Sequence, residues 1–207
     1  MPGIDLLISR YLSNEIKIQL KPNILKKIER DLFFLHGMSI KLSIENFETL
    51  HNLLRQIPEI DVKFFEKSCM DNVVSVSRKN NEYEVTITNV KLLNKLFNYL
   101  GDDETRKLLT SIMGKNLTIP EILSETKILK SPAYRKIENL LLDGVIIESG
   151  KILSNNKRVS QYKCLFKEFQ SFIAKDKFKI VLIIDKNDLE TSSVFKFGVL
   201  ENPTLDF

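Results

Sequence analysis

Residues 118–146, TIPEILSETKILKSPAYRKIENLLLDGVI, contain the clearest structural signals of the chain. The stretch opens on TIPE, the pattern of a capping box, with Thr118 as the helix cap and Glu121 as the side chain that reaches back to it. Pro120 falls in the first turn, where its missing N–H costs no hydrogen bond. The pattern predicts a short helix of about two turns that ends near Thr126.

A second helix is expected after a turn at residues 127–130. Ser131 is the expected N-cap, and Pro132 is the expected first helical residue. Asp143-Gly144 is a sharp exit, since glycine readily takes the left-handed conformation that follows a helix. The inward face, at spacing i, i+4, i+7 and i+8, consists of Ala133, Ile137, Leu140 and Leu141.

Elements on both sides complete a recognisable order. A helix is expected after Asp102-Asp103, with its inward stripe at Leu108, Leu109, Ile112 and Met113 and its end at Gly114. Downstream, one strand begins at Val145 and a second covers residues 159–166, with a further turn expected at Ser149-Gly150 and a polar loop at 154–158. Three helices followed by such a hairpin predict a winged helix-turn-helix domain at residues 102–166.

This domain type suggests contacts with double-stranded DNA. A helix-turn-helix inserts the N-terminal part of its second helix into the major groove, and we expect helix 132–143 to do so. Bases at the tip of the hairpin would neutralise phosphates. Segment 127–163 has eight basic and three acidic residues, a net charge of +5, so the rest of the +4 chain sums to −1. The expected DNA-binding residues are Ser131, Tyr134, Arg135, Lys136, Asn139, Lys157 and Arg158.

The segment SPAYRKIENLLLDGVI, residues 131–146, resembles the recognition helix of ArsR-like winged helix-turn-helix transcription regulators, especially those of archaea. Those regulators share a Ser, a small residue and Tyr-Arg ahead of an amphipathic helix that ends in Gly. The resemblance, over residues 102–166, implies a DNA-binding regulator. Pro132 departs from the family, in which a hydroxyl residue is common there, and this removes one phosphate donor. Residues 23–54 weakly resemble output or sensor-type domains of archaeal regulators.

The whole chain is expected to be an α+β protein. Residues 1–101 form a mixed α/β regulatory or dimerisation domain, residues 102–166 the winged helix-turn-helix, and residues 167–207 a C-terminal strand extension and tail. Strands are expected at 177–185 and 195–200 of that extension. In the first domain, helices are expected at 4–12, at 22–36 before Gly37, at 44–57 after an N-cap at Ser43, and at 90–100; strands are expected at 15–20, 38–42, 72–78 and 82–88, with a turn at 79–81.

Other classes of function have little support in the sequence. No glycine-rich phosphate loop, GxSxG or HExxH occurs, so we expect no enzyme and no cofactor. His36 is interpreted as a partner of a helix C-terminus and His51 as a partly buried, satisfied histidine, with no metal site. Cys69 and Cys164 are expected to be buried. No apolar run reaches the ~18 residues of a membrane span, so a cytoplasmic location without membrane contact is expected.

Two alternatives stay open at this level. The domain is either a sequence-specific regulator or a winged-helix module that contacts protein, or DNA without preference, as in basal transcription machinery. A two-fold operator would call for a homodimer, and the first domain, helix 90–100 or the C-terminal strands could supply its interface. An unidentified small molecule or protein could act on the first domain as an effector.

Overall fold

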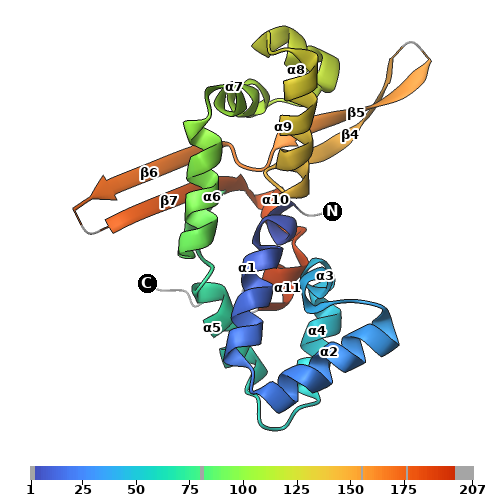
Figure 1. The fold of residues 1–207 in the computed structure, drawn as a ribbon, viewed down its shortest axis with the longest axis vertical. Helices are drawn as coiled ribbons and strands as arrows, with labels where there is room; N and C mark the ends of the chain where they lie inside the picture. Colours follow the sequence, from blue (N-terminus) through green and yellow to red (C-terminus); the bar gives the residue numbers. More distant parts are fainter. Residues whose placement is uncertain (1–2, 80–81, 155, 176, 199–207) are drawn as a thin grey trace.

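The computed structural model describes residues 3–79, 82–154, 156–175 and 177–198 of the 207 residues. The fold is mixed α and β, with two antiparallel sheets. Figure 1 shows an elongated molecule, with α1 to α5 and α11 at one end and α7 to α9 at the other. Hairpins β4–β5 and β6–β7 extend from opposite sides of this body.

One long helix, α1 (Gly3–Gln19), occupies the N-terminal region. The predicted strand at 15–20 is therefore wrong. Its alternating pattern also fits a helix, because Leu12, Ile16 and Leu20 recur every four residues, and all three are buried. Ile18, the remaining apolar residue of the alternation, is 75% exposed.

The next helices pack beside α1. As predicted, α2 (Pro22–His36) ends at Gly37, where φ is +64°. The predicted strand at 38–42 is wrong: the residues form α3 (Ile40–Ser43), which continues through a 3-10 turn (Ile44–Asn46) into α4 (Phe47–Arg55). The helical region starts early because the Ser39 side chain accepts a hydrogen bond from the Leu42 N–H. Ser43, the predicted cap, is buried and donates to the Ile40 carbonyl instead.

A four-stranded sheet follows α5 (Val62–Asp71). The predicted strands appear as β1 (Val74–Lys79) and β2 (Glu82–Ile87), and the predicted helix as α6 (Val90–Gly101). The expected turn at 79–81 includes residues 80 and 81, which lie outside the described residues. The sheet order is β1-β2-β7-β6, with β6 at Glu168–Ala174 and β7 at Lys177–Asp185. β7 confirms the predicted strand, whereas β6 was not anticipated.

The C-terminal helices return to the first half of the chain. α10 (Lys186–Glu190) leads to α11 (Ser193–Gly198). The strand predicted at 195–200 is therefore wrong over residues 195–198, which are helical. Residues 199–207, which include the rest of that strand and the predicted tail, lie outside the described residues. Val194 and Phe195 are fully buried. Asp5 of α1, also buried, accepts hydrogen bonds from the N–H and hydroxyl of Ser193 at 2.8 and 3.0 Å. Burial raises the pKa of Asp5 above its ordinary value.

Residues 102–166 form three helices and a three-stranded sheet. The helices are α7 (Asp103–Ile112), α8 (Ile119–Thr126) and α9 (Lys130–Leu142). The sheet order is β3-β5-β4, from β3 (Leu117–Thr118), β5 (Lys157–Cys164) and β4 (Ile146–Ser154). The expected turn at Ser149-Gly150 is a shift of register within β4.

Of the two helix caps predicted in this region, one is confirmed, since both bonds of the capping box at Thr118 and Glu121 are present. Asp102, expected only as an acid before α7, caps that helix by accepting from the Thr105 N–H at 2.8 Å. The cap predicted at Ser131 is wrong, because α9 begins at Lys130 after an extended Leu129, and no side chain caps it. Pro132 still falls in the first turn, where proline is tolerated.

Candidate nucleic-acid interface

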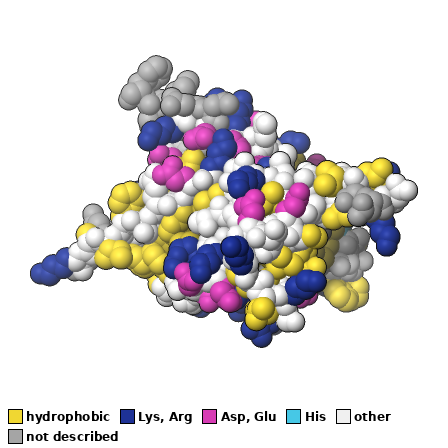
Figure 2. All heavy atoms as spheres, turned by 90° about the horizontal axis from the view of Figure 1, so that it is seen from above, with side chains coloured by type: hydrophobic (Ala, Val, Ile, Leu, Met, Phe, Trp, Pro, Cys, Tyr) yellow, Lys and Arg dark blue, Asp and Glu magenta, His cyan; other side chains and the backbone are white. Residues whose placement is uncertain are grey.

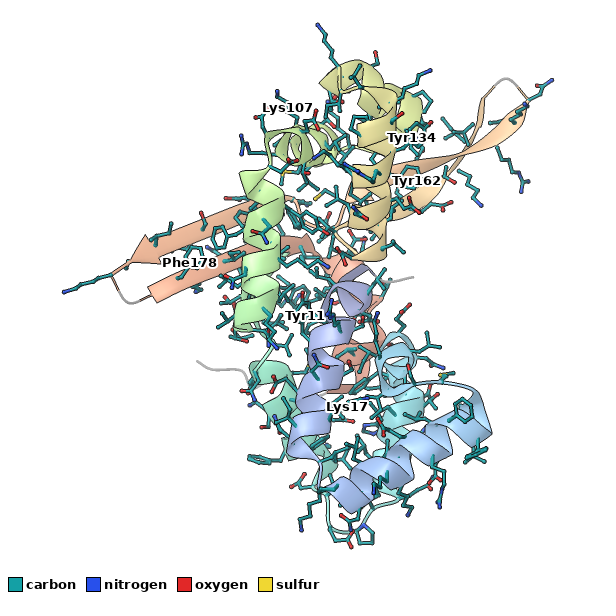
Figure 3. All side chains as sticks on the ribbon, in the orientation of Figure 1. Tyr11, Lys17, Lys107, Tyr134, Tyr162 and Phe178 are labelled. Carbon is teal, nitrogen blue, oxygen red and sulfur yellow. The ribbon has the colours of Figure 1, made fainter. Side chains whose placement is uncertain are left out.

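Helix α9 has one buried and one exposed face. Ala133, Ile137 and Leu140 are buried as predicted, and Leu141 is half-buried. Ser131, Tyr134, Arg135 and Asn139 lie on the exposed face, together with Glu138. Tyr134 is 49% exposed, and Figure 3 places it on the flank of α9 turned toward hairpin β4–β5. These polar side chains are not packed in the core, so they are accessible to a binding partner.

Lys136 differs from the other predicted residues of α9. Its Nζ lies 2.5 Å from Asp102 Oδ1 and 3.5 Å from Glu104 Oε2, and its side chain is only 19% exposed. The hydrogen bond from Lys136 holds the pKa of the Asp102 carboxyl well below its ordinary value. Lys136 thus joins α9 to the start of α7, and its charge, unlike that of Arg135, is already paired with carboxylates.

Hairpin β4–β5 carries the second group of predicted residues. Its strands pair from Ile146↔Cys164 to Ser154↔Lys157, so Lys157 and Arg158 lie at the tip. Both are exposed. Asn156 turns the chain with φ at +60°, a left-handed conformation that asparagine tolerates. The tip stands well clear of the helices in Figure 1, which leaves its two cations accessible.

Ion pairs divide the basic residues of segment 102–166 into two sets. Paired bases sit on α7, in the loop after α7, at Lys136 of α9 and on the sheet. Arg106, for example, pairs with Asp103 at 2.9 Å, Lys115 with Glu125 at 3.1 Å, and Lys163 with Asp188 at 2.6 Å. Within the part of 102–166 that the structure describes, the bases without a carboxylate partner are Lys127, Lys130, Arg135, Lys157 and Arg158.

These unpaired bases form two groups rather than one continuous patch. Lys127, Lys130 and Arg135 lie between the end of α8 and the first half of α9, and Lys157 with Arg158 at the tip of β4–β5. Figure 2 looks down on this end of the molecule and shows separate groups of Lys and Arg with Asp and Glu between them. The sequence-based candidates omitted Lys127 and Lys130, although both counted toward the basic segment.

His51 and the two cysteines have structural roles. His51 Nδ1 lies 3.0 Å from Glu66 Oε1, consistent with the predicted satisfied histidine. Cys69 and Cys164 are buried as predicted, and burial raises the pKa of each thiol to about 12, which opposes thiolate formation at neutral pH. Over the described residues, no three His, Cys, Asp or Glu side chains gather into a metal-binding set.

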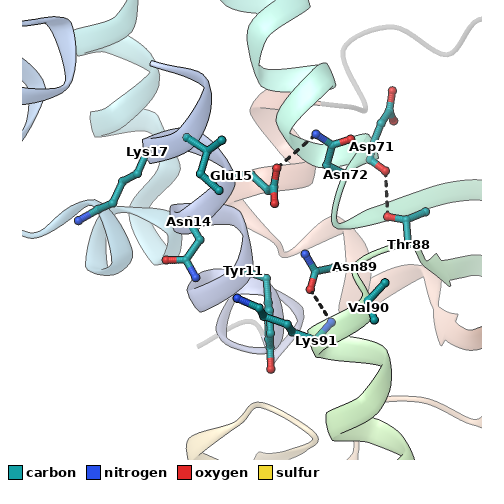
Figure 4. Close-up of a pocket in the computed structure, with 11 residues that line it drawn as sticks. Tyr11, Asn14, Glu15, Lys17, Asp71, Asn72, Thr88, Asn89, Val90 and Lys91 are labelled. Carbon is teal, nitrogen blue, oxygen red and sulfur yellow. Dashed lines mark hydrogen bonds between the residues drawn. The ribbon is translucent and has the colours of Figure 1, made fainter. Parts of the chain in front are cut away.

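One cavity lies away from both basic groups. It has a volume of about 640 Å³ between α1 and the segment joining β2 to α6, and Figure 4 shows its lining. Two of its polar side chains have partners in the structure: Asn72 Nδ2 donates to Glu15 at 3.2 Å, and Asn89 Oδ1 accepts from the Lys91 N–H at 3.1 Å.

Compared with known proteins, the chain matches no family model, no curated protein and no solved structure. Among the described residues, no helix is both long and apolar enough to cross a membrane. The function is therefore inferred from the residues and their geometry.

Proposed function

We propose that this chain is a DNA-binding transcription regulator whose residues 102–166 act as a winged helix-turn-helix. Support comes first from the order of elements, α7-β3-α8-α9-β4-β5, in which β3 pairs with β5 at the base of the hairpin. In this proposal α9 enters the major groove and hairpin β4–β5 is the wing on the adjacent backbone. The ArsR-like regulators that residues 131–146 resemble use the corresponding helix in this way.

The observation that carries the proposal is the position of the five unpaired bases. Carboxylates neutralise the cations on the other elements of this region, while those at the start of α9 and at the wing tip have none among the described residues. A phosphate backbone supplies the missing counter-charge. Lys130 also stands at the N-terminus of α9, where free N–H groups and the helix dipole favour a phosphate.

Different residues would supply specificity and affinity. Arg135 can bind guanine in a bidentate manner, and Asn139 can do the same with adenine. The Tyr134 hydroxyl can donate to a phosphate, and Lys157 and Arg158 would bind phosphates without reading sequence. Lys136 is left out of this assignment, because Asp102 and Glu104 bind it.

Selection of bound duplexes from random DNA, followed by salt-titrated anisotropy, tests the proposal. Enrichment of a motif is expected, and Arg135→Ala should reduce the preference for that motif. The double variant Lys157→Ala/Arg158→Ala should weaken binding to all duplexes and lower the slope of log K against log salt by about 1.8, at ~0.9 per phosphate contact.

A charge-matched control is available on α2. Lys26 and Lys27 are exposed, belong to no ion pair in the described structure and lie at the opposite end of the molecule. Lys26→Ala/Lys27→Ala removes the same charge and should leave binding unchanged. Equal losses for the two double variants would show a general charge effect and contradict the assignment to the wing.

Exposed leucines favour a second candidate function, a winged-helix module that contacts protein. Leu129 before α9 is 78% exposed, Leu142 at its end 67%, and Leu153 near the wing tip 73%. If the selection enriches no motif and Arg135→Ala has no effect, sequence-specific regulation is excluded. This module, or one that binds DNA without preference, then becomes the better explanation.

A further inference from the structure

The far end of hairpin β6–β7 extends beyond the four-stranded sheet. β2 pairs with β7 only from Ile180 to Asp185, whereas β6 pairs with β7 out to Ala174↔Lys177. The last three pairs of β6–β7 therefore form a ribbon of two strands, which projects from the body in Figure 1. A ribbon of this kind is marginally stable in water unless something covers it.

Apolar side chains lie on both faces of this ribbon. Ile173 and Phe178 are paired across the strands, and Phe178 stacks on Phe97 of α6 at 3.9 Å between ring centroids. Phe172 follows the alternation of the strand onto the other face. Ile173 is 80% exposed, Phe172 54% and Phe178 42%.

The outer edge of β6 is open. β6 ends the sheet, and no other strand pairs with this edge in the part of the chain that the structure describes. Soluble proteins usually protect such an edge with Lys, Pro or a bulge. Here the outer half of β6 has Phe172, Ile173 and Ala174 instead, so the edge and its apolar residues together suit the addition of another strand.

Charge along the hairpin favours a particular occupant. The tip end has the exposed bases Lys175 and Lys179. At the base end, Lys167 is already paired with Glu82 of β2 at 3.1 Å and with Asp185 of β7 at 2.5 Å, and both of these strands lie behind β6 in the sheet. Glu168 is the carboxylate on β6 itself. A second copy of β6 running antiparallel would place Lys175 of each copy near Glu168 of the other.

We propose that the chain forms a homodimer in which the β6 strands of two copies pair antiparallel, joining their sheets and covering Phe172 and Ile173. The interface is isologous, as a two-fold dimer requires. It uses no residue of 102–166, so it is independent of the proposed DNA contacts.

Sedimentation of the full chain over a concentration series tests the dimer. The wild-type chain should sediment as a dimer, and Ile173→Lys as a monomer, because it places a charge in the covered edge. Leu35→Lys on α2, at an apolar site that is 69% exposed, is the matched control and should remain dimeric. Circular dichroism should show unchanged secondary structure for both variants. The proposal would be overturned if the wild-type chain were monomeric, whether or not the edge of β6 bound an extended peptide. It would also be overturned if Ile173→Lys and Leu35→Lys dissociated equally.

A charge reversal tests the antiparallel arrangement. Lys175→Glu should raise the dimer Kd roughly tenfold, because the two-fold axis repeats each of these surface contacts and every one becomes a repulsion. The double variant Glu168→Lys/Lys175→Glu should recover most of that loss. A Lys175→Glu chain that dimerises as well as the wild type would rule out the pairing of Lys175 with Glu168. So would a double variant that dimerises more weakly than Lys175→Glu alone.

Discussion

At Gly144 the exit of α9 comes into contact with the first turns of α1. The residue has φ at +71°, and a Cβ added there would overlap the Gly3 carbonyl oxygen and lie 2.7 Å from the Leu7 N. A side chain on Gly3 would in turn overlap Ile147 of β4. The absence of a Cβ at Gly144 thus allows the backbones of the N-terminal helix and of the proposed recognition helix to touch.

Gly144→Ala should therefore destabilise the protein by more than the cost of placing an alanine in a left-handed conformation. Gly114 is the matched control, since its φ is +67° and nothing lies within 4 Å of an added Cβ. We expect Gly114→Ala to lower the free energy of unfolding by about 1–2 kcal/mol, and Gly144→Ala by about 3 kcal/mol or more because the backbones must also separate. Urea unfolding measures both values, and equal losses would show that the contact with α1 contributes nothing.

At the scale of elements, Asp102 joins three helices. It follows α6 directly, caps α7 through the Thr105 N–H and binds Lys136 of α9. On α9, neighbouring bases have different roles: Lys136 pairs with Asp102, whereas Arg135 is exposed and has no carboxylate partner among the described residues. The position of α9, and so the direction in which Arg135 points, depends in part on Asp102.

Asp102→Asn should keep the cap but lose the ion pair. At neutral pH we expect it to lower the free energy of unfolding by less than about 1 kcal/mol, because the Asp102 side chain is 45% exposed and solvent screens the pair. Asp102→Ala should cost about 1 kcal/mol more, because the cap is lost as well.

The pH dependence of the same variants has a definite sign. Lys136 holds the pKa of Asp102 below its ordinary 3.8 in the folded protein. The ion pair therefore stabilises the fold above pH 3.8, and its contribution is lost as the pH falls toward the lowered pKa. The difference in unfolding free energy between wild type and Asp102→Asn should shrink accordingly below pH 3.8. A difference that is constant or grows in acid would contradict the ion pair as its source.

In the whole molecule, the two ends of the described chain meet. α11 packs against α4 and α5, and its first residue, Ser193, binds Asp5 of α1 and the Ile44 carbonyl. Phe195 fills the core between these helices. The end of the chain thus completes the core that the first helices begin, and the Gly3–Gly144 contact attaches that core to α9.

Phe195→Ala should lower the free energy of unfolding by about 3–5 kcal/mol, as removal of a buried phenylalanine does. Phe34→Ala on α2 removes the same atoms from a side chain that is 76% exposed, and should change stability by less than about 0.5 kcal/mol. Thermal or urea unfolding followed by circular dichroism compares the two. If the losses were similar, α11 would not be an essential part of this core.

The sequence alone was sufficient wherever a structural signal is local. The ends of α2, α8 and α9 and the capping box at Thr118 each depend on a few neighbouring residues, so their pattern predicts them. The exposed face of α9 also followed from helical spacing. Only the tertiary structure decided the rest: the helical state of residues 15–19, the partner of Lys136, the strand pairing of β6 and the helix at α11. The reason is that residues distant in the chain settle each of these, through packing against other helices, a carboxylate 34 positions away, or a neighbouring strand.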